Sequence, residues 1–188
     1  MLFVETPLPG AYVIEIEPRT DDRGFFGRAF CQNEFAERGL NPVIAQSNVG
    51  FSKIGGTVRG MHFQFPPHSD TKLVRATRGA ILDVIVDLRP ESSTYLRTYA
   101  VELSAESYRA LYIPARFAHG YQTLQDNTET WYHAGVPYAP GFEGGLSPFD
   151  PRLDIHWPLP VTAISEKDRS WKHLDGAEPE LRNRMSLP

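Results

Sequence analysis

GAILDVIVDLRP, residues 79–90, has the composition of a buried strand. It is rich in β-branched residues and is closed by Gly79 and Pro90, two residues that commonly bound strands. Strands separated by turn residues at spacings of roughly a dozen residues predict an all-β sandwich or barrel. The other stretches of this kind are AYVIEIEP (11–18), TYAVELS (98–104), RALYIPARF (109–117), GYQTLQ (120–125) and TETWYHAGV (128–136).

Helices are expected to be few and short. The clearest candidate is NEFAERGL (33–40), in which Asn33 can cap the helix and Gly39 can end it. A second short helix is expected within EKDRSWKHL (166–174). The proline-rich segment 140–160 is expected to be extended and turn-rich, and its prolines confine any strand there to a sheet edge.

Composition narrows the class of protein. Residues 1–188 contain no repeat, low-complexity tract or linker, so we expect one domain. The formal net charge of −4 does not favour a nucleic-acid partner. Cys31 is the single cysteine, which excludes an internal disulfide and suits a reducing compartment. With no signal peptide and no apolar stretch of about 20 residues, we expect a soluble, cytoplasmic protein without a membrane partner.

Two histidines raise the question of a metal site. His62 lies in RGMHFQ (59–64), and His119 lies in PARFAHGYQ (114–122). Many cupin barrels bind a metal through an H-x-H pair, a glutamate and a distant histidine, because alternate residues of a strand share a face. Here Gln64 occupies the second position of the pair, and no glutamate follows in QFPPHSDTK. We therefore predict no metal site, which leaves either a proton-transfer role or ordinary core hydrogen bonds for the two histidines.

A set of motifs spread over about residues 15–170 favours the proton-transfer role. Through these motifs the chain resembles the dTDP-4-dehydrorhamnose 3,5-epimerase family of cupin-fold sugar epimerases, because they occur in the order of that family and with near-family spacing. The matching stretches are DDRGFF (21–26), QSN (46–48), VRGMHFQ (58–64), KLVRATRGAILDVIVDLRPESSTY (72–95), VELSAESYRALYIPARFAHGYQTL (101–124), WYHAGVPYAPGFEGGL (131–146), DPRLDIHWPL (150–159) and ISEKDR (164–169).

The resemblance implies both a fold and a reaction. The fold is a cupin-type jelly-roll barrel with short flanking helices, assembled as a homodimer that exchanges N-terminal segments. The reaction inverts C3, C5 or both in a dTDP-linked 4-keto-6-deoxyhexose. The ketone lets a neighbouring carbon lose its proton to form an enolate, so the reaction needs a base, an acid on the opposite face and a donor to the enolate oxygen. This chemistry requires neither a metal nor a cofactor.

The same resemblance assigns the catalytic roles. His62 matches the base, and Asp168 matches the carboxylate that fixes its tautomer. Tyr132 matches the acid, since a phenol stays protonated at neutral pH. Strand alternation permits an inward Tyr132 because it shares a face with Thr130 and Ala134. Lys72 is similar to the lysine that faces the enolate oxygen.

Further positions match contacts to the nucleotide diphosphate and sugar. Arg59 and Arg23 match phosphate contacts, with Arg23 reaching in from the other subunit. Strict alternation would place Arg59 and His62 on opposite faces, so we expect a bulge at Gly60. The remaining matched positions are Gln46, Asn48, His119, Tyr138, Glu143 and Lys167.

Three residues depart from the family pattern: Arg28 after the RGFF stretch, Ser47 in QSN, and His133 after the acid tyrosine. We expect these changes to lie near the sugar and nucleotide, which leaves the exact substrate open. The alternatives are a monofunctional 3- or 5-epimerase acting on a different nucleotide sugar, a sugar-nucleotide-binding cupin without activity, and a metal-dependent cupin oxygenase or isomerase.

Overall fold

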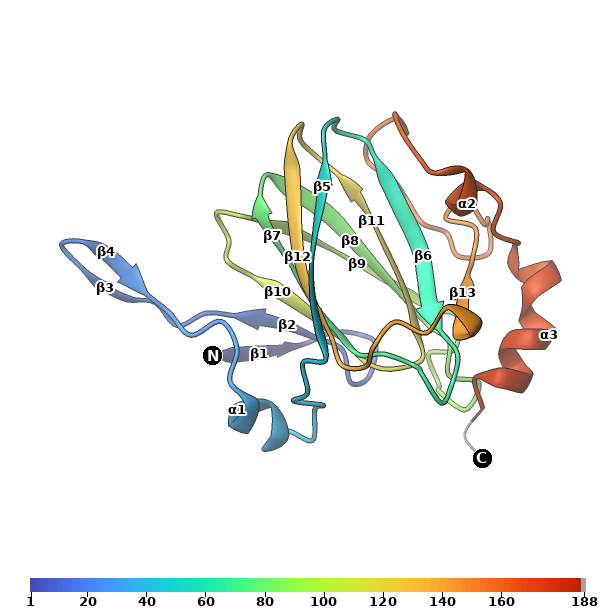
Figure 1. Ribbon diagram of the computed structural model, residues 1–188, viewed down its shortest axis with the longest axis horizontal. Coiled ribbons are helices and arrows are strands. Elements are labelled where there is room, and N and C mark those ends of the chain that lie inside the picture. Colours follow the sequence, from blue (N-terminus) through green and yellow to red (C-terminus); the bar gives the residue numbers. More distant parts are fainter. Residues whose placement is uncertain (187–188) are drawn as a thin grey trace.

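The computed structural model describes residues 1–186 as two antiparallel sheets with helices at their flanks (Figure 1). The six-stranded sheet has the spatial order β1 (Leu2–Glu5), β2 (Tyr12–Glu15), β10 (Ala110–Ile113), β7 (Lys72–Arg78), β12 (Thr128–Ala134), β5 (Gln46–Ser52). The five-stranded sheet has the order β13 (Glu143–Gly145), β6 (Val58–Gln64), β11 (Phe117–Thr123), β8 (Ala80–Asp87), β9 (Thr98–Ser104). The prediction of an all-β jelly-roll is confirmed.

Strand alternation divides the apolar residues into an inner core and two outer layers. Ile81 and Ile85 of β8 join Leu111 of β10 in the core between the sheets. Val84 and Val86, on either side of Ile85, face outward into a cluster on the other side of the five-stranded sheet. Because side chains alternate along a strand, each sheet can bury both faces.

Short helices cover the outer layers. They are α1 (Gln32–Ala36), the 3-10 turn η1 (Pro140–Phe142), α2 (Glu166–Arg169) and α3 (Leu174–Arg184). Leu174 and Leu181 of α3 are buried in the outer cluster of the five-stranded sheet. No helix within residues 1–186 is both long enough and apolar enough to cross a membrane.

The expected details of the helices are corrected in part. The first helix begins at Gln32, so Asn33 lies inside it, and its N-cap is Cys31, which makes no side-chain capping bond. Gly39 does follow the helix, with a φ of 69° that favours glycine. The predicted second helix is the short α2, whereas α3 was not anticipated. The prediction of an edge strand in segment 140–160 is confirmed by β13.

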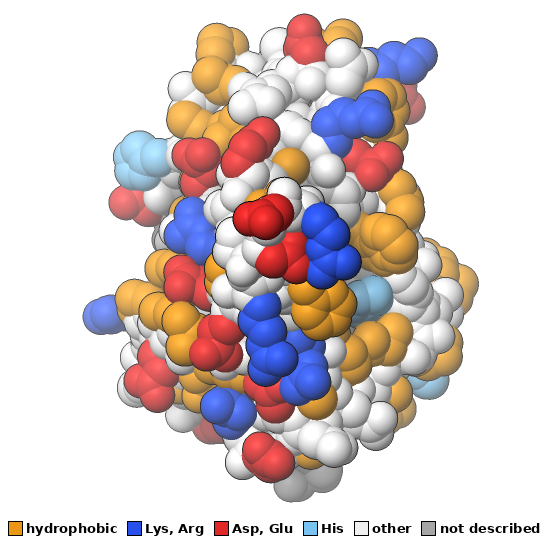
Figure 2. All heavy atoms as spheres, turned by 90° about the vertical axis from the view of Figure 1, so that its left-hand side faces the viewer, with side chains coloured by type: hydrophobic (Ala, Val, Ile, Leu, Met, Phe, Trp, Pro, Cys, Tyr) orange, Lys and Arg blue, Asp and Glu red, His pale blue; other side chains and the backbone are white. Residues whose placement is uncertain are grey.

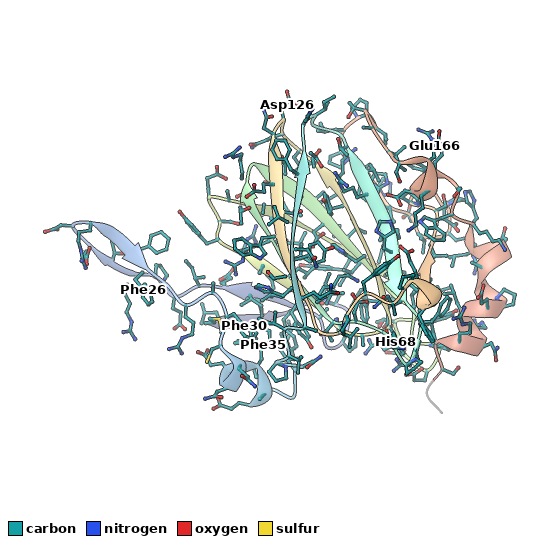
Figure 3. The ribbon with its side chains drawn as sticks, in the orientation of Figure 1. Phe26, Phe30, Phe35, His68, Asp126 and Glu166 are labelled. Atoms are coloured by element: carbon teal, nitrogen blue, oxygen red, sulfur yellow. The ribbon has the colours of Figure 1, made fainter. Side chains whose placement is uncertain are left out.

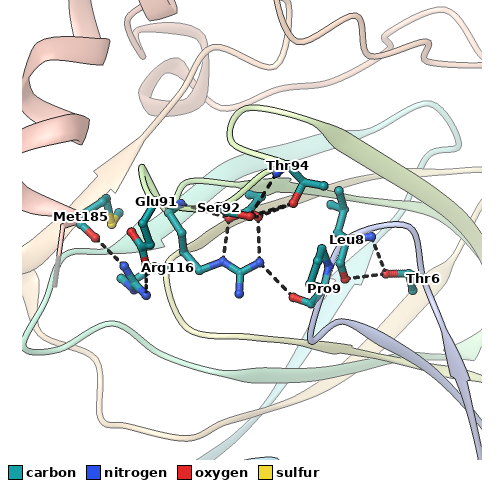
Figure 4. A network of polar contacts seen from close by, with 10 residues as sticks. Thr6, Leu8, Pro9, Glu91, Ser92, Thr94, Arg116 and Met185 are labelled. Carbon is teal, nitrogen blue, oxygen red and sulfur yellow. Dashed lines mark hydrogen bonds and ion pairs between the residues drawn. The ribbon is translucent and has the colours of Figure 1, made fainter.

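A polar network fixes the end of β8. Asp87 is fully buried, and its carboxylate accepts hydrogen bonds from Arg89, Ser92 and Thr94 (Figure 4). Burial alone would raise the pKa of Asp87, but these hydrogen bonds lower it overall. This carboxylate therefore anchors the loop between β8 and β9.

A two-stranded ribbon, β3 (Arg19–Asp21) with β4 (Gly24–Phe26), projects away from the sheets (Figure 1). Phe26 lies on this ribbon and is 76% exposed (Figure 3). Figure 2 views the molecule from this side and shows acidic and basic side chains interspersed with hydrophobic ones. The ribbon thus presents a large apolar side chain to its surroundings.

Candidate active site

A cavity of about 340 Å³ opens between the two sheets, where β5 and β12 face β6 and β11. Strands β5 and β6 follow one another in the chain but belong to different sheets, so the sandwich is open between them. Polar side chains from both sheets project into this opening. Of the predicted site residues, those that line the cavity are Gln46, Asn48, Arg59, His62, Lys72, His119, Tyr132, Tyr138 and Glu143.

His62 and Asp168 form a close pair at one wall. His62 Nε2 lies 2.6 Å from Asp168 Oδ1, and Gly60 N donates to Asp168 Oδ2 over 3.2 Å. Although burial raises the pKa of Asp168, the hydrogen bond and charge of His62 lower it overall. The ionised carboxylate can only accept, so a neutral His62 carries its hydrogen on Nε2. Its Nδ1 is then the nitrogen free to accept a proton.

Helix α2 delivers Asp168 to this pair. Ser165 caps the helix, because its Oγ accepts from the backbone N–H of Asp168 over 3.0 Å. Asp168 is only 4% exposed although it lies on a four-residue helix at the surface of the sandwich. The ISEKDR motif therefore begins a helix and directs a carboxylate onto β6.

The predicted bulge at Gly60 is confirmed. In the ladder between β6 and β11, His62 pairs with His119, but Arg59 pairs with Tyr121, so β6 contains one extra residue. This places both Arg59 and His62 in the cavity lining. Gly60 has a φ of 129°, and a Cβ there would lie 2.5 Å from Gly120 Cα. Only glycine suits this close approach of two strands.

Tyr132 lies on the facing wall, in β12 of the six-stranded sheet. It lines the cavity together with Ala134, an inward orientation that alternation permitted but did not require. Burial raises the pKa of Tyr132, and the neighbouring Tyr121 and Asp70 raise it further. The phenol thus keeps its proton at neutral pH.

Lys72 and His119 each bind a buried carboxylate. Lys72 Nζ lies 2.9 Å from Asp70 Oδ2. His119 Nε2 lies 2.5 Å from Oδ1 of Asp83, which is fully buried. The second oxygen of Asp83 has no hydrogen-bond partner among residues 1–186. These pairs fix a cation and an imidazole in the cavity wall.

Asp70 and Asp83 were not singled out from the sequence. Asp83 had a usable signal, because an acid inside the apolar run GAILDVIVDLRP, like Asp87 further along it, must find a partner when the strand is buried. Asp70 had no such signal, since it lies in a loop between two motifs. Its place in the cavity wall follows from the topology, because the loop that carries it connects β6 and β7 of the two facing sheets.

The mouth of the cavity has its own network. Lys167 Nζ donates to Glu143 Oε1 over 2.6 Å, and Tyr138 Oη donates to Glu143 Oε2 over 2.9 Å. Burial raises the pKa of Glu143, but the hydrogen bonds from Lys167 and Tyr138 lower it overall. The backbone N–H of Tyr138 also donates to Gln46 Oε1 over 2.6 Å. Lys167 therefore reaches the site through Glu143.

Arg23 is the predicted site residue that lies apart. Its side chain is 89% exposed on the β3–β4 ribbon and pairs with Asp21 of the same turn. It does not line the cavity of its own chain. Its predicted role requires the pocket of another subunit.

The three departures from the family pattern do not line this cavity. Ser47 and His133 are neighbours of the inward residues Asn48 and Tyr132, so alternation places them on the outer face of the sheet. Ser47 Oγ accepts from Trp131 Nε1 over 2.5 Å. Arg28 donates to Glu34 of α1 over 2.8 Å.

The position where cupins place a metal ligand serves a different purpose here. Gln64 Nε2 donates to the backbone oxygen of His68, and its Oε1 accepts from the backbone N–H of Ala139 over 2.6 Å. Among residues 1–186, no three side chains of the His, Cys, Asp or Glu type are grouped to hold a metal ion. The fold and the site define a jelly-roll protein with a His–Asp pair and a tyrosine across one cavity.

Comparison with known proteins gives the family. The model for dTDP-4-dehydrorhamnose 3,5-epimerase matches residues 5–176. The dTDP-4-dehydrorhamnose 3,5-epimerase of Methanothermobacter thermautotrophicus is 43% identical, over 92% of this chain and 94% of its own. The chain belongs to the dTDP-4-dehydrorhamnose 3,5-epimerase family.

Solved structures of relatives share the fold. The enzyme of the same name from Elizabethkingia anophelis NUHP1 superposes with a TM-score of 0.91 at 36% identity, covering 94% of this chain and 97% of that one. The Legionella pneumophila Philadelphia 1 epimerase, solved in complex with dTDP-4-keto-L-rhamnose, superposes with a TM-score of 0.88 at 33% identity. Coverage there is 96% of both chains.

Proposed function

We propose that this protein epimerises C3 and C5 of a dTDP-linked 4-keto-6-deoxyhexose, with His62 as base and Tyr132 as acid. The observation that carries the proposal is the placement of these two groups. His62 belongs to β6 of the five-stranded sheet, and Tyr132 belongs to β12 of the six-stranded sheet, across the same cavity. A sugar ring held between the sheets then has the base on one face and the acid on the other.

The mechanism moves one proton off the ring and another onto it. Nδ1 of His62 removes the proton from a carbon beside the ketone, and the electron pair moves onto the ketone oxygen to form an enolate. Asp168 stabilises the imidazolium that results, and the Lys72 ammonium faces the enolate oxygen. When the ketone re-forms, the Tyr132 phenol delivers a proton to the same carbon from the opposite face. Configuration at that carbon is inverted.

Binding of the nucleotide diphosphate is proposed for the polar groups around the catalytic centre. Arg59 supplies a guanidinium fork, which suits phosphate oxygens. His119 adds an imidazole that Asp83 holds in place. Gln46, Asn48, Tyr138, Glu143 and Lys167 complete the binding surface at and near the mouth. We also propose that Arg23 acts in the pocket of a second copy, so that the protein works as a dimer.

The dimer can be tested on its own. The β3–β4 ribbon carries both Arg23 and the exposed Phe26, and a second copy would cover this apolar surface. Sedimentation at micromolar concentration should give a dimer. A monomer with full activity would contradict the role of Arg23 across the interface.

The reaction itself is tested by deuterium incorporation from D₂O into dTDP-4-keto-6-deoxyglucose, read at C3 and C5 by NMR. Wild-type enzyme should exchange and invert both positions, and His62→Ala should do neither. His156→Ala is the matched control, because the His156 side chain is 85% exposed and stands far from any role in the proposal. Normal exchange by His62→Ala would rule out His62 as the base.

The same measurement separates the alternatives. Exchange confined to C3 or to C5 would identify a monofunctional epimerase. Binding of dTDP without any exchange would indicate a non-catalytic sugar-nucleotide-binding protein.

A further inference from the structure

Asp70 is a carboxylate that the proposed reaction does not use, although it lines the same cavity as His62 and Tyr132. It is only 8% exposed. The cavity is proposed to hold a diphosphate and an enolate, which are both anionic. A buried carboxylate loses its hydration and also repels such ligands, so it requires a compensating partner. That partner is Lys72, whose Nζ lies 2.9 Å from Asp70 Oδ2.

The loop around Asp70 is fastened on both sides. Arg116 N donates to Ser69 Oγ over 2.6 Å, and Gly135 N donates to the backbone oxygen of Thr71 over 2.9 Å. Asp70 is short and sits between these anchors, whereas a lysine has a flexible four-carbon stem. The carboxylate is thus the fixed member of the pair, and it sets the position of the ammonium.

We propose that Asp70 is a positioning residue that holds the Lys72 ammonium aimed at the point where the enolate oxygen forms. This inference rests on the proposed function. Without Asp70, the lysine stem can swing its charge onto the diphosphate, which is present throughout the reaction. In contact with the enolate oxygen, the ammonium stabilises only the transition state. In contact with the diphosphate, it would stabilise the bound substrate as much as the transition state and would not speed the reaction.

The first test separates turnover from binding. Asp70→Asn should lower kcat about 10- to 100-fold, somewhat less than the loss of a complete oxyanion donor. The dissociation constant for dTDP should stay the same or fall, because a negative charge has left an anion-binding cavity. Asp154→Asn is the matched control, since it removes the same charge from a side chain that is 84% exposed. A purely structural role would instead lower the melting temperature and weaken dTDP binding together with kcat.

The second test shows whether Asp70 acts through Lys72. If it does, Asp70→Asn should cause no further loss of kcat in a Lys72→Ala background, because the group it positions is already absent. If the two losses multiply instead, Asp70 acts on the substrate directly and the proposal is wrong. Should Asp70→Asn fail to fold, Asp70→Glu keeps the charge but moves it by one methylene, and it should lower kcat while preserving dTDP affinity.

The outcomes distinguish this inference from the proposed function. A wild-type protein that exchanges no ring proton would refute the proposed function and, with it, the role of Asp70. A wild-type protein that epimerises, beside an Asp70→Asn variant of equal kcat, would refute the role of Asp70 alone.

Discussion

Replacement of Asp168 by asparagine should slow epimerisation about 100-fold while the fold is retained. Asparagine has nearly the same size, and the capping bond from Ser165 involves the backbone of residue 168 and is unaffected. What the variant loses is a negative charge beside the imidazolium that His62 becomes in the proposed reaction, together with one of the two hydrogen bonds that Asp168 accepts, from His62 and from Gly60 N. The loss should therefore appear in the rate of proton removal rather than in binding of dTDP.

The magnitude follows from the geometry. The closest atoms of the pair, His62 Nε2 and Asp168 Oδ1, are 2.6 Å apart. With charge centres about 4 Å apart, the attraction is about 4 kcal/mol at an effective dielectric constant of about 20. Because each 1.36 kcal/mol is a factor of ten, the upper limit is about 1000-fold. The amide oxygen of asparagine can still accept from His62 and recovers part of this attraction, which gives the expected value of about 100-fold.

The assay is the initial rate of exchange at C3 and C5 in D₂O, with dTDP affinity and melting temperature measured in parallel. Glu166→Gln is the matched control, since it removes an exposed carboxylate from the same helix α2. A wild-type rate in Asp168→Asn would refute the argument. An equal loss in Glu166→Gln would show that the charge of the helix matters rather than the contact with the base.

Further outcomes are expected from the geometry of the fold and site. Tyr132→Phe should retain deuterium exchange from one face but lose inversion, as NMR of the recovered sugar would reveal. Because hydrogen bonds hold the pKa of Asp87 below its ordinary value despite its burial, this group stabilises the fold above about pH 4, and that stability is lost as the pH falls. Urea titrations should find the free energy of unfolding falling below about pH 4, with a weaker fall in Asp87→Asn. Gly145→Ala should lower stability by about 1–3 kcal/mol, because a Cβ there would lie 2.2 Å from the Trp171 ring; an unchanged melting curve would contradict this. Since Gln64 stands where a metal ligand is expected in cupins, exhaustive chelation should leave turnover unchanged, and a rate restored only by an added divalent ion would count against the proposal.

The strands could be predicted because their apolar residues alternate or run together between turns, as in β8 and β9. Helix α3 could not, because it contains Gly176 and Pro179, two poor helix formers. It is held by tertiary burial of Leu174 and Leu181 against the sheet. The error at Asn33 has a related cause, since a possible cap does not decide where a helix begins when packing of Phe35 sets its position.

The site was predictable to a different extent. Alternation alone permitted an inward Tyr132 and required a bulge near Gly60. The pairing of His62 with Asp168 could not follow from periodicity, because the two residues are 106 positions apart and belong to different elements. It came from family resemblance, and the contact distance now gives it a physical basis. Asp70 was missed because nothing in the sequence of its loop shows that its carboxylate pairs with Lys72.

The separation of His62 from Asp168 also has a consequence during synthesis. Strand β6 can pair with β11 once residue 123 has left the ribosome, but its histidine then has no carboxylate beside it. The partner arrives only when α2 emerges and docks on Gly60. A growing chain can therefore pair β6 with β11 before its histidine has a carboxylate beside it. A chain that ends before residue 168 would lack this carboxylate, and on the proposed mechanism its base would be weakened as in Asp168→Asn.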